Sequence, residues 1–496
     1  MSQSASKHRP NVLLIVTDHW PGALLGVAGH PAIHTPTIDQ LADNGTRFTR
    51  AYSEIPVCGP ARRCIMTGTS PRAHGDRLFK FPPCTPMPPF PTLAQTFRNA
   101  GYQAFGVGKN DVFPQRSRIG FDDVLLDGEG RYESGIVDDY ELFLGDEGFP
   151  GQQFMHGLSS NEYIWRPWHL PEHCHVTNWA TNQMCRTIRR RDPQRPGFWY
   201  IGYRHPHPPL APLREYLEMY RDIAIDDAFD GEWSRQGNEA ALPVLIRDDR
   251  ALHEPLSREN VRAIRRAFYA LCTHVDHQIR LLIGTLHQEG ILDNTIIVFT
   301  SDHGDMLGNH GLWAMSRFYE WSTNIPLIVQ GVANCPRVGH HRTDGRLVAL
   351  QDLMPTLLDL AGLEIPACAT GQSMFGGARR RYLFGEIQEH QRATRMIRTE
   401  RHKLIYYPAG NRTQLFDLQN DPDELRDLSA SSPHSGIRDE LMQTLISELY
   451  GNDLEWIKDG RLEGLPDYEV QPCVNRSLLN QRGTFWPPPV NPKARI

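Results

Sequence analysis

The sequence has no long apolar segment. Its longest apolar run near the N-terminus covers residues 12–16 and ends at Thr17 and Asp18. Such a run is too short for the core of a signal peptide or for a membrane span. We therefore expect a cytoplasmic protein that has no membrane partner.

The chain also lacks a strong net charge, a disulfide pattern and an internal repeat. Its formal net charge of −6 gives no electrostatic reason to expect nucleic acid or an anionic membrane as a partner. The nine cysteines are odd in number and form no closely spaced pairs, which is typical of reduced thiols. The composition, with 40% hydrophobic and 22% charged residues, is that of an ordinary globular protein.

Two apolar runs rich in β-branched residues each end in polar residues. Residues 11–17 lead into Asp18, and residues 294–300 lead, after one serine, into Asp302 and His303. Such runs predict strands that are buried on both faces of a parallel sheet. In open α/β sheets, ligands bind at the carboxyl edge of the strands, so these residues are candidates for a shared site. The alternative for Asp18 is a turn residue at a strand end.

The most distinctive stretch covers residues 56–68, which predict a short loop that runs into a helix. Pro60 suits the first helical turn, and Cys58 would lie at the helix N-terminus, which favours an anion. Arg62 follows one turn later, and a cysteine beside arginine at such a position is electropositive and reactive. A buried structural cysteine is the alternative, and the geometry alone leaves both interpretations open.

These residues match a known signature. Cys-x-Pro-x-Arg followed by Thr-Gly, and then Pro-Arg-Ala-His-Gly at residues 71–75, resembles the signature of formylglycine-dependent sulfatases of the alkaline phosphatase superfamily. The resemblance implies that a formylglycine-generating maturation enzyme oxidises Cys58 to formylglycine, whose hydrate is the nucleophile. It also implies that Asp18, as the first acidic residue after the first strand, binds a metal ion.

Two further stretches resemble parts of the same family. Residues 101–109 resemble its second signature, in which Lys109 would contact the sulfate, although Asp111 stands where the family usually has histidine. The Pro-His-x-Pro loop that follows the strand at 198–202 would place His207 toward the leaving group. A solvent-exposed lysine and a structural histidine are the alternatives for these two residues. The resemblance also makes two neighbours of His207 candidates for substrate binding, Arg204 and His205.

A predicted metal site follows from the resemblance of Asp302 and His303 to the second metal-binding pair of the family. With Asp18 and an oxygen of oxidised Cys58, they would bind one divalent ion. An all-oxygen site favours calcium and the imidazole shifts the preference toward manganese or zinc, so we expect manganese or calcium, with zinc as the alternative. The lysine that the family has twelve residues after the pair is Met315, and Arg317 is a candidate replacement that would bind substrate.

We expect an α/β protein that is built on a large, mostly parallel sheet flanked by helices, as in alkaline phosphatase. This catalytic domain would cover residues 1–375, including a long helix at 256–290. Short strands predict a smaller C-terminal α+β domain at 376–460. Residues 461–496 form an extended tail, whose Phe-Trp-Pro-rich end is a candidate arm for a homo-oligomer.

The resulting prediction is hydrolysis of a sulfate ester of a small organic molecule, such as a sulfated sugar or choline sulfate. The alternative is a phosphonate monoester or phosphodiester hydrolase with the same nucleophile, because His19 and His303 resemble that group and the choline sulfatases. A non-catalytic, metal-stabilised binding protein is a third interpretation. The intact signature around Cys58 disfavours it, since a binding protein has no need of an oxidisable cysteine.

Overall fold

The structure is a computed structural model, which describes residues 9–78, 85–129, 137–158, 163–235, 242–252, 256–333 and 335–470. Its centre is an eight-stranded sheet with the order β4-β3-β5-β1-β6-β7-β2-β8. The strands are β1 (Asn11–Asp18), β2 (Thr46–Tyr52), β3 (Gln103–Gly108), β4 (Asp123–Leu126), β5 (Gly197–Pro206), β6 (Thr295–Ser301), β7 (Leu327–Gln330) and β8 (Arg342–Ala349).

Five of the seven strand pairings in this sheet are parallel, and only β7 runs antiparallel to its two neighbours. Strand β1 lies between β5 and β6 and is buried along its whole length. A strand buried on both faces reads as a continuous apolar run, which is why the sequence pattern identified it. The predicted large, mostly parallel sheet is confirmed.

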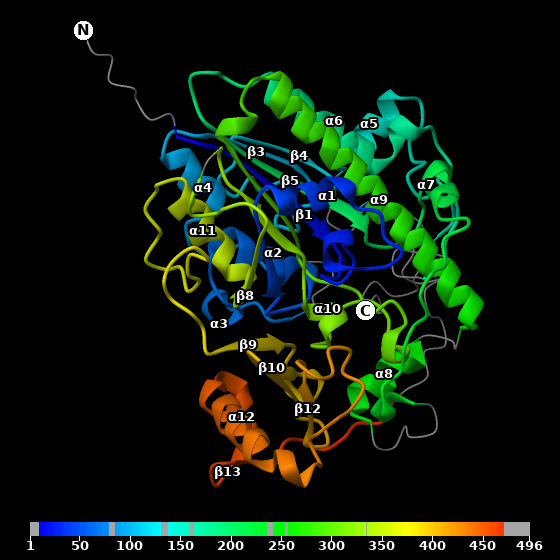
Figure 1. Cartoon of the computed structure of the whole chain (residues 1–496), viewed down its shortest axis with the longest axis vertical. Helices are drawn as coiled ribbons and strands as arrows, with labels where there is room; N and C mark the ends of the chain where they lie inside the picture. Colours follow the sequence, from blue (N-terminus) through cyan, green and yellow to red (C-terminus); the bar gives the residue numbers. More distant parts are fainter. Residues whose placement is uncertain are drawn as a thin grey trace.

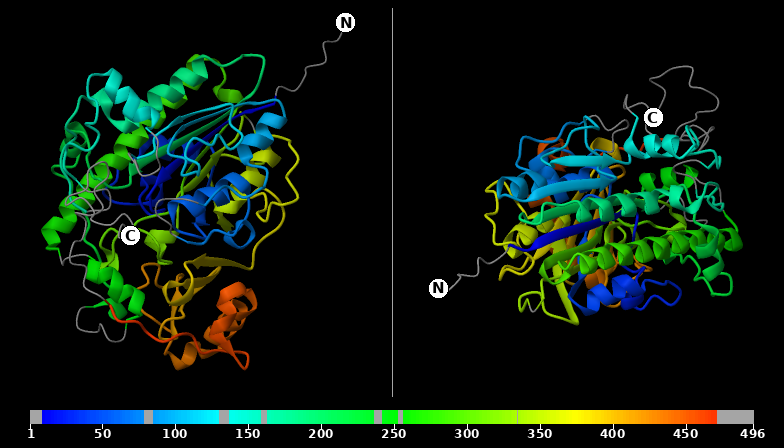
Figure 2. Two further views of the ribbon diagram at one scale, coloured as in Figure 1. Left: turned by 180° about the vertical axis from the view of Figure 1, so that it is seen from behind. Right: turned by 90° about the horizontal axis from the view of Figure 1, so that it is seen from above.

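Helices cover both faces of the sheet (Figure 1), and the layers are seen edge-on in the right view of Figure 2. Alternate residues of β1 point to opposite layers: Leu13 and Ile15 pack with α1, α6 and α9, whereas Val12 and Leu14 pack with α2, α4 and α11. These helices are α1 (Pro36–Asp43), α2 (Cys58–Thr67), α4 (Leu93–Asn99), α6 (Val176–Arg189), α9 (Arg258–Gln288) and α11 (Leu353–Leu360).

The long helix predicted at 256–290 is α9, which spans 31 residues. Ser257 caps its N-terminus by accepting a hydrogen bond from the Asn260 backbone N–H. In the part of the chain that the structure describes, no helix is both long enough and apolar enough to cross a membrane. The remaining helices are α3 (Pro71–His74), α5 (Asp139–Asp146), α7 (Arg214–Met219), α8 (Val244–Leu252), α10 (Glu320–Thr323) and α12 (Ser435–Glu448).

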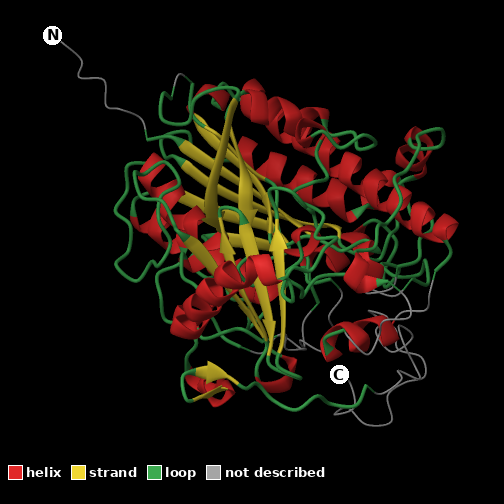
Figure 3. Cartoon of the chain, turned by 60° about the horizontal axis from the view of Figure 1, so that its bottom comes forward, coloured by secondary structure: helices red, strands yellow, loops and turns green. Residues whose placement is uncertain are grey.

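A second, antiparallel sheet of four strands follows in the order β12-β11-β10-β9 (Figure 3). Helix α12 packs on it through Leu441 and Leu445, which confirms the predicted C-terminal α+β part. The exact limits at 375 and 460 stay a prediction, and residues 471–496, with the proposed oligomer arm, lie outside the described residues. The strands are β9 (Tyr382–Ile387), β10 (Thr394–Thr399), β11 (His402–Tyr407) and β12 (Arg412–Asp417), and a short hairpin adds β13 (Ile457–Lys458) and β14 (Arg461–Leu462).

The small sheet supports the cysteine loop. Val57, the residue before α2, packs in one apolar cluster with Phe318 and with Met396 and Tyr407 of the small sheet. Buried Lys403 of β11 also forms ion pairs with Glu320 at 2.6 Å and Glu424 at 2.8 Å. The apolar cluster therefore packs the start of α2 against the small sheet.

Candidate active site

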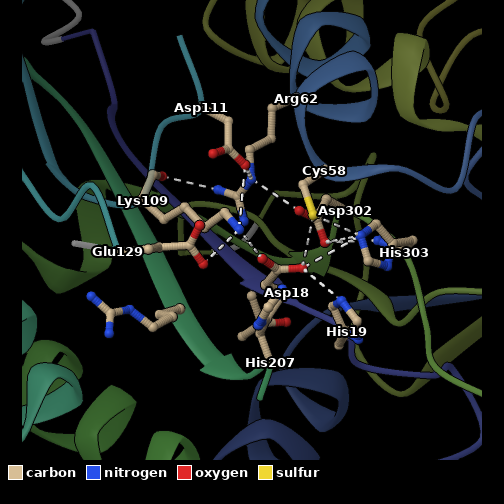
Figure 4. Close-up of polar contacts among 12 residues, drawn as sticks. Asp18, His19, Cys58, Arg62, Lys109, Asp111, Glu129, His207, Asp302 and His303 are labelled. Carbon is tan, nitrogen blue, oxygen red and sulfur yellow. Dashed lines mark hydrogen bonds and ion pairs between the residues drawn. The ribbon is translucent and has the colours of Figure 1, made fainter. Parts of the chain in front are cut away.

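The carboxyl ends of four neighbouring strands meet at one buried site (Figure 4). Asp18 is the last residue of β1, Lys109 follows β3, and Asp302 follows β6. Strand β5 ends in the loop that carries His207, and α2 begins at Cys58. All five side chains are 5% exposed or less, so the site is a closed interior cluster of polar groups.

Two glycines place Lys109 at this edge. Gly108 of β3 has φ +91°, and a Cβ there would lie 2.2 Å from the Gly202 carbonyl oxygen. A Cβ on Gly202 of β5 would likewise lie 2.0 Å from the Lys109 carbonyl oxygen. The strands can approach this closely only without side chains, and the Lys109 N–H donates to Gly202 at 2.7 Å.

Several metal-ligating atoms converge on the carboxylate of Asp18. His303 Nε2 lies 3.4 Å from Asp18 Oδ1 and 3.2 Å from the Cys58 sulfur. His19 Nε2 lies 3.8 Å from the same Asp18 oxygen. Potential ligand atoms of these four residues lie within 4.8 Å of one another. Asp302 Oδ1 lies beside them, 3.7 Å from His303 Nε2.

The two histidines direct their Nε2 atoms toward this point because Nδ1 is engaged elsewhere. His303 Nδ1 donates to the Gly304 carbonyl at 3.0 Å, and His19 Nδ1 donates to Asp305 at 2.6 Å. His19 Nε2 has no hydrogen-bond partner of ordinary geometry among the described residues. Burial lowers the pKa of His19, but contacts with Asp305 and Cys58 raise it by more, to about 9, so without a metal the ring carries a proton that a divalent cation beside the carboxylate oxygens would replace. The residues therefore fit a metal ion.

The structure brings all four predicted metal ligands together and adds His19. His19 was not among the predicted ligands, although its position directly after Asp18 is a signal that could have identified it. Glu129 was not predicted either, and it has no comparable signal because it lies in an irregular loop. Glu129 Oε1 forms an ion pair with Lys109 Nζ at 3.0 Å.

Lys109 and Arg62 are buried cations, and each contacts several acidic groups. Lys109 Nζ contacts Asp18 directly and lies 3.4 Å from Asp111. Arg62 donates to Asp302 at 2.9 Å and to the Tyr200 hydroxyl at 2.7 Å. Asp111, which stands where the family has histidine, is therefore part of the site. Two permanent cations in a buried cluster can hold the charge of an anionic ester.

The charges shift the pKa values of the group. Burial alone would raise the pKa of Asp18, but Lys109, followed by His207 and His19, lowers it well below its ordinary value. Burial lowers the pKa of Lys109, yet Asp111 and Asp18 raise it by more, so the net pKa is above its ordinary value. Both groups therefore carry charge at neutral pH.

The unmodified thiol of Cys58 is not activated. Burial, and then Asp18, raises its pKa to about 11. Of the two interpretations that the sequence left open, an electropositive setting of the thiol is not supported by Arg62, whose guanidinium donates to Asp302 rather than to the sulfur. The sulfur instead lies 3.7 Å from the Asp18 carboxylate. A thiolate nucleophile is thus disfavoured here.

His207 lies on the side of Asp18 that faces away from Cys58 (Figure 4). Its ring stands edge-on to that of His19 at 4.3 Å, and Nδ1 donates to the Pro208 carbonyl at 2.5 Å. Burial, with His19, lowers the pKa of His207 well below its ordinary value. Asp18, Glu129 and His207 offer atoms within 4.8 Å of one another, so His207 borders the site.

The other predicted substrate residues have structural partners. Arg204 forms a buried ion pair with Asp127, and the His205 Nδ1–H donates to the His207 carbonyl at 3.1 Å. Arg317 pairs with Asp249 at 2.5 Å, and no contact found among the described residues joins it to the Asp18 cluster. The substrate-binding roles of these three residues stay predictions.

Comparisons with known proteins identify the family. A family profile described as Sulfatase matches residues 10–363, and one described as N-sulphoglucosamine sulphohydrolase, C-terminal, matches residues 308–450. The chain is 32% identical to an arylsulfatase of Clostridium perfringens over 478 residues, which cover 92% of this chain and 98% of the relative. It is 29% identical to a choline-sulfatase of Rhizobium meliloti, over 85% of this chain and 82% of the relative.

A solved structure is similar across nearly the whole fold. The phosphonate monoester hydrolase of Agrobacterium radiobacter superposes with a TM-score of 0.77 at 25% identity, covering 88% of this chain and 95% of that structure. These similarities confirm the predicted family and fit the predicted branch, near choline sulfatases and phosphonate monoester hydrolases. The chain belongs to the sulfatase family of sulfuric ester hydrolases.

Proposed function

We propose that this enzyme hydrolyses the sulfate ester of a small organic molecule, such as a sulfated sugar or choline sulfate. The nucleophile is residue 58 after conversion of Cys58 to formylglycine by a maturation enzyme. The observation that carries the proposal is the intact cysteine signature, whose cysteine begins α2 within 3.2 Å of His303 and beside Asp18. The identity to an arylsulfatase and a choline-sulfatase supports the same reaction.

One divalent ion would be held by Asp18, Asp302, His303 and residue 58, with His19 as a further candidate. When bound, such an ion acts as a Lewis acid that lowers the pKa of a coordinated hydroxyl group. Manganese, calcium and zinc are the candidates for this ion.

The chain's own residues supply the rest of the chemistry. Lys109 and Arg62 would hold the charged sulfate oxygens, and Asp302 orients the Arg62 guanidinium. In net hydrolysis the bond between sulfur and the ester oxygen breaks, and one water oxygen ends on sulfate. The water that is consumed supplies the proton that the leaving oxygen takes up, and His207, whose lowered pKa leaves its imidazole neutral, would bind beside that oxygen.

A second candidate function is hydrolysis of a phosphonate monoester or phosphodiester. It is favoured by the similarity to a phosphonate monoester hydrolase and by Met315, an apolar residue at the expected lysine position. Sulfate monoesters and phosphonate monoesters carry the same single negative charge, so charge does not separate them. The extra substituent on phosphorus needs room that a third sulfate oxygen does not.

The decisive experiment has two parts. Mass spectrometry of enzyme co-produced with a maturation enzyme should find an aldehyde in the peptide that contains Cys58. Assays with matched aryl sulfate and aryl phenylphosphonate esters, and with a panel of natural sulfate esters, should then favour sulfate. A phosphonate preference above about tenfold, roughly 1.4 kcal/mol of transition-state stabilisation, would reverse the assignment.

Localisation and assembly complete the proposal. We place the enzyme in the cytoplasm, where imported small esters would be its substrates. The C-terminal tail is proposed to join copies of the chain, which gel filtration of the full chain and of a chain ending at residue 470 would test.

A further inference from the structure

We propose that Asp305 and Tyr163 hold His19 as a metal ligand, and that the site therefore binds transition-metal ions such as zinc in preference to calcium. The inference rests on the metal-dependent function proposed above and deepens it. Asp305 and Tyr163 are positioning residues, because they act on the metal through His19.

The backbone turns sharply at His19. Its φ of +68° lies in the left-handed region, which is unfavourable for a residue other than glycine. This turn directs the imidazole back over the end of β1, where its ring lies 4.6 Å from that of His303. An unfavourable backbone conformation persists only where the surrounding contacts determine it, so His19 is held in place by its neighbours.

Asp305 supplies the main contact. One of its carboxylate oxygens accepts both the His19 Nδ1–H at 2.6 Å and the Tyr163 hydroxyl. Its other oxygen accepts the Leu307 backbone N–H at 2.9 Å. Asp305 is fully buried, and Tyr163 packs its ring against Trp313 at 4.6 Å. Three hydrogen bonds therefore fix the Asp305 carboxylate, which in turn sets the orientation of the His19 imidazole.

The Asp305–His19 pair is the kind of carboxylate–histidine pair that supports a metal ligand in many proteins. A carboxylate on Nδ1 fixes the tautomer, leaves the Nε2 lone pair toward the metal and raises the basicity of the ligand. His19 Nε2 lies 3.8 Å from Asp18 Oδ1 and has no hydrogen-bond partner of ordinary geometry among the described residues. A purely structural ion pair would not require this nitrogen to face the other candidate ligands.

The metal preference follows from the donor atoms. His19 and His303 offer two imidazole nitrogens, while Asp18 and Asp302 offer carboxylate oxygens. Calcium takes six to eight oxygen ligands, whereas imidazole suits zinc and similar ions. Two imidazoles close to one carboxylate oxygen thus narrow the earlier choice of manganese, calcium or zinc, and calcium becomes the least suitable.

The test measures metal binding rather than turnover. Apo enzyme is prepared with a chelator, and the dissociation constants of zinc and calcium are measured by competition for Asp305→Asn, Tyr163→Phe and His19→Gln. We expect zinc binding to weaken about 10- to 100-fold in the first two variants and more in His19→Gln, with calcium binding changed less than about threefold. The absorption spectrum of the cobalt-substituted enzyme should change in all three.

The matched control is Tyr220→Phe, which removes another buried hydroxyl that hydrogen-bonds Thr273 at 2.6 Å. It should leave zinc affinity and the cobalt spectrum unchanged. Unchanged zinc affinity in folded Asp305→Asn and His19→Gln would overturn the inference. X-ray absorption of the wild-type zinc enzyme needs no variant: two imidazole ligands are expected, and one would overturn it.

The outcomes separate this inference from the proposed function. Two imidazole ligands without sulfatase turnover would leave the inference standing and reject the function. Turnover with one imidazole ligand, or tighter binding of calcium than of zinc, would reject the inference alone. A wild-type enzyme that binds no divalent ion would reject both.

Discussion

Two neighbouring regions of the molecule bury ionisable side chains in opposite ways. The cluster around Asp18 keeps its groups charged, with Lys109 and Arg62 among carboxylates. Near the loop that carries His207, five histidines pack in two ring-to-ring groups that are joined through Trp168, and burial lowers the pKa of all five. We call this group the histidine row: His156, His169, His175, His205 and His274.

The difference lies in the partners. His175 lies 5.1 Å from His205 and 4.7 Å from His274, ring to ring. Burial, and then His169 beside His156 and Arg204 beside His205, lowers the pKa of each of these two histidines to about 3. Among the described contacts, the row contains no carboxylate that would stabilise an imidazolium. Its histidines therefore stay neutral and act as polar packing.

The comparison shows where the fold retains buried charge. A buried ion is tolerated when an opposite charge offsets its desolvation. Lys109 and Arg62 of the Asp18 cluster have such partners, whereas no contact among the described residues brings a carboxylate to the imidazoles of the row. A hydrogen bond from His205 Nδ1–H to the His207 carbonyl, at 3.1 Å, links the two regions. The neutral row thus supports the loop of the charged site without adding charge to it.

The largest expected effect comes from removing the predicted nucleophile. Cys58→Ala should abolish turnover, with a loss of at least about 10⁴-fold, because no other group can replace residue 58. The folded state should remain, since the side chain is small and its loss removes little apolar contact. Steady-state assays and thermal unfolding measure the two effects. Residual turnover within tenfold of wild type would reject Cys58 as the source of the nucleophile.

The second test removes charge from the cluster. Asp302→Asn should lose metal and activity together, by more than about 100-fold, because the ion loses an anionic ligand and Arg62 loses its carboxylate partner. Elemental analysis and assays measure both losses. Asp226→Asn, which removes a carboxylate paired with Arg265 outside the site, is the control. Full metal occupancy in Asp302→Asn would contradict the assignment of Asp302 as a ligand.

The third test concerns the neutral histidine row. With a folded pKa of about 3 and an unfolded pKa near 6.5, His156 takes up a proton more readily in the unfolded state. Its contribution is therefore fully present above pH 6.5 and is lost as the pH falls toward 3. Between pH 7.5 and 5.5 this one histidine should cost about 1.4 kcal/mol of unfolding free energy.

Denaturant unfolding at the two pH values measures this loss. His156→Gln should lose about 1.4 kcal/mol less than wild type over this range. His341→Gln, at an exposed side chain, should behave like wild type. An equal pH dependence in His156→Gln and wild type would show that the row is not a source of acid sensitivity.

Sequence patterns predicted the elements that local chemistry determines. The buried strands β1 and β6 are continuous apolar runs, and the polar residues at their ends meet because parallel strands end at one edge. The start of α2 followed from Pro60 and the cysteine signature. These features depend on residues close together in the chain, so a pattern of a few residues could predict them.

The missed features depend on contacts between distant segments. Asp305, which hydrogen-bonds His19, lies 286 positions from it in the sequence, and Tyr163, which hydrogen-bonds Asp305, lies 142 positions from Asp305. Glu129 reaches Lys109 from an irregular loop, and Arg62 turns to Asp302 rather than to Cys58. Neither the periodicity of the sequence nor the spacing of its motifs predicts which of several acidic groups a buried cation will contact.

The smallest expected effect concerns Met315, which bears on the choice between sulfate and phosphonate. The backbone N–H of Ser316 donates to the Pro56 carbonyl at 3.0 Å, so this segment runs beside the loop that carries Cys58. A lysine at 315 would extend the cationic side of the charged cluster, where a third sulfate oxygen needs a donor. It would also occupy the room that a substituent on phosphorus needs.

Met315→Lys should therefore raise kcat/KM for an aryl sulfate and lower it for the matched aryl phenylphosphonate. A change of about tenfold in the ratio corresponds to roughly 1.4 kcal/mol, which is within the range of one charge-assisted hydrogen bond. Met219→Lys, at an exposed methionine on α7, controls for added positive charge and should leave the ratio unchanged. If Met315→Lys changes neither reaction, Met315 lies outside the substrate pocket, and the missing lysine has no bearing on which ester is cleaved.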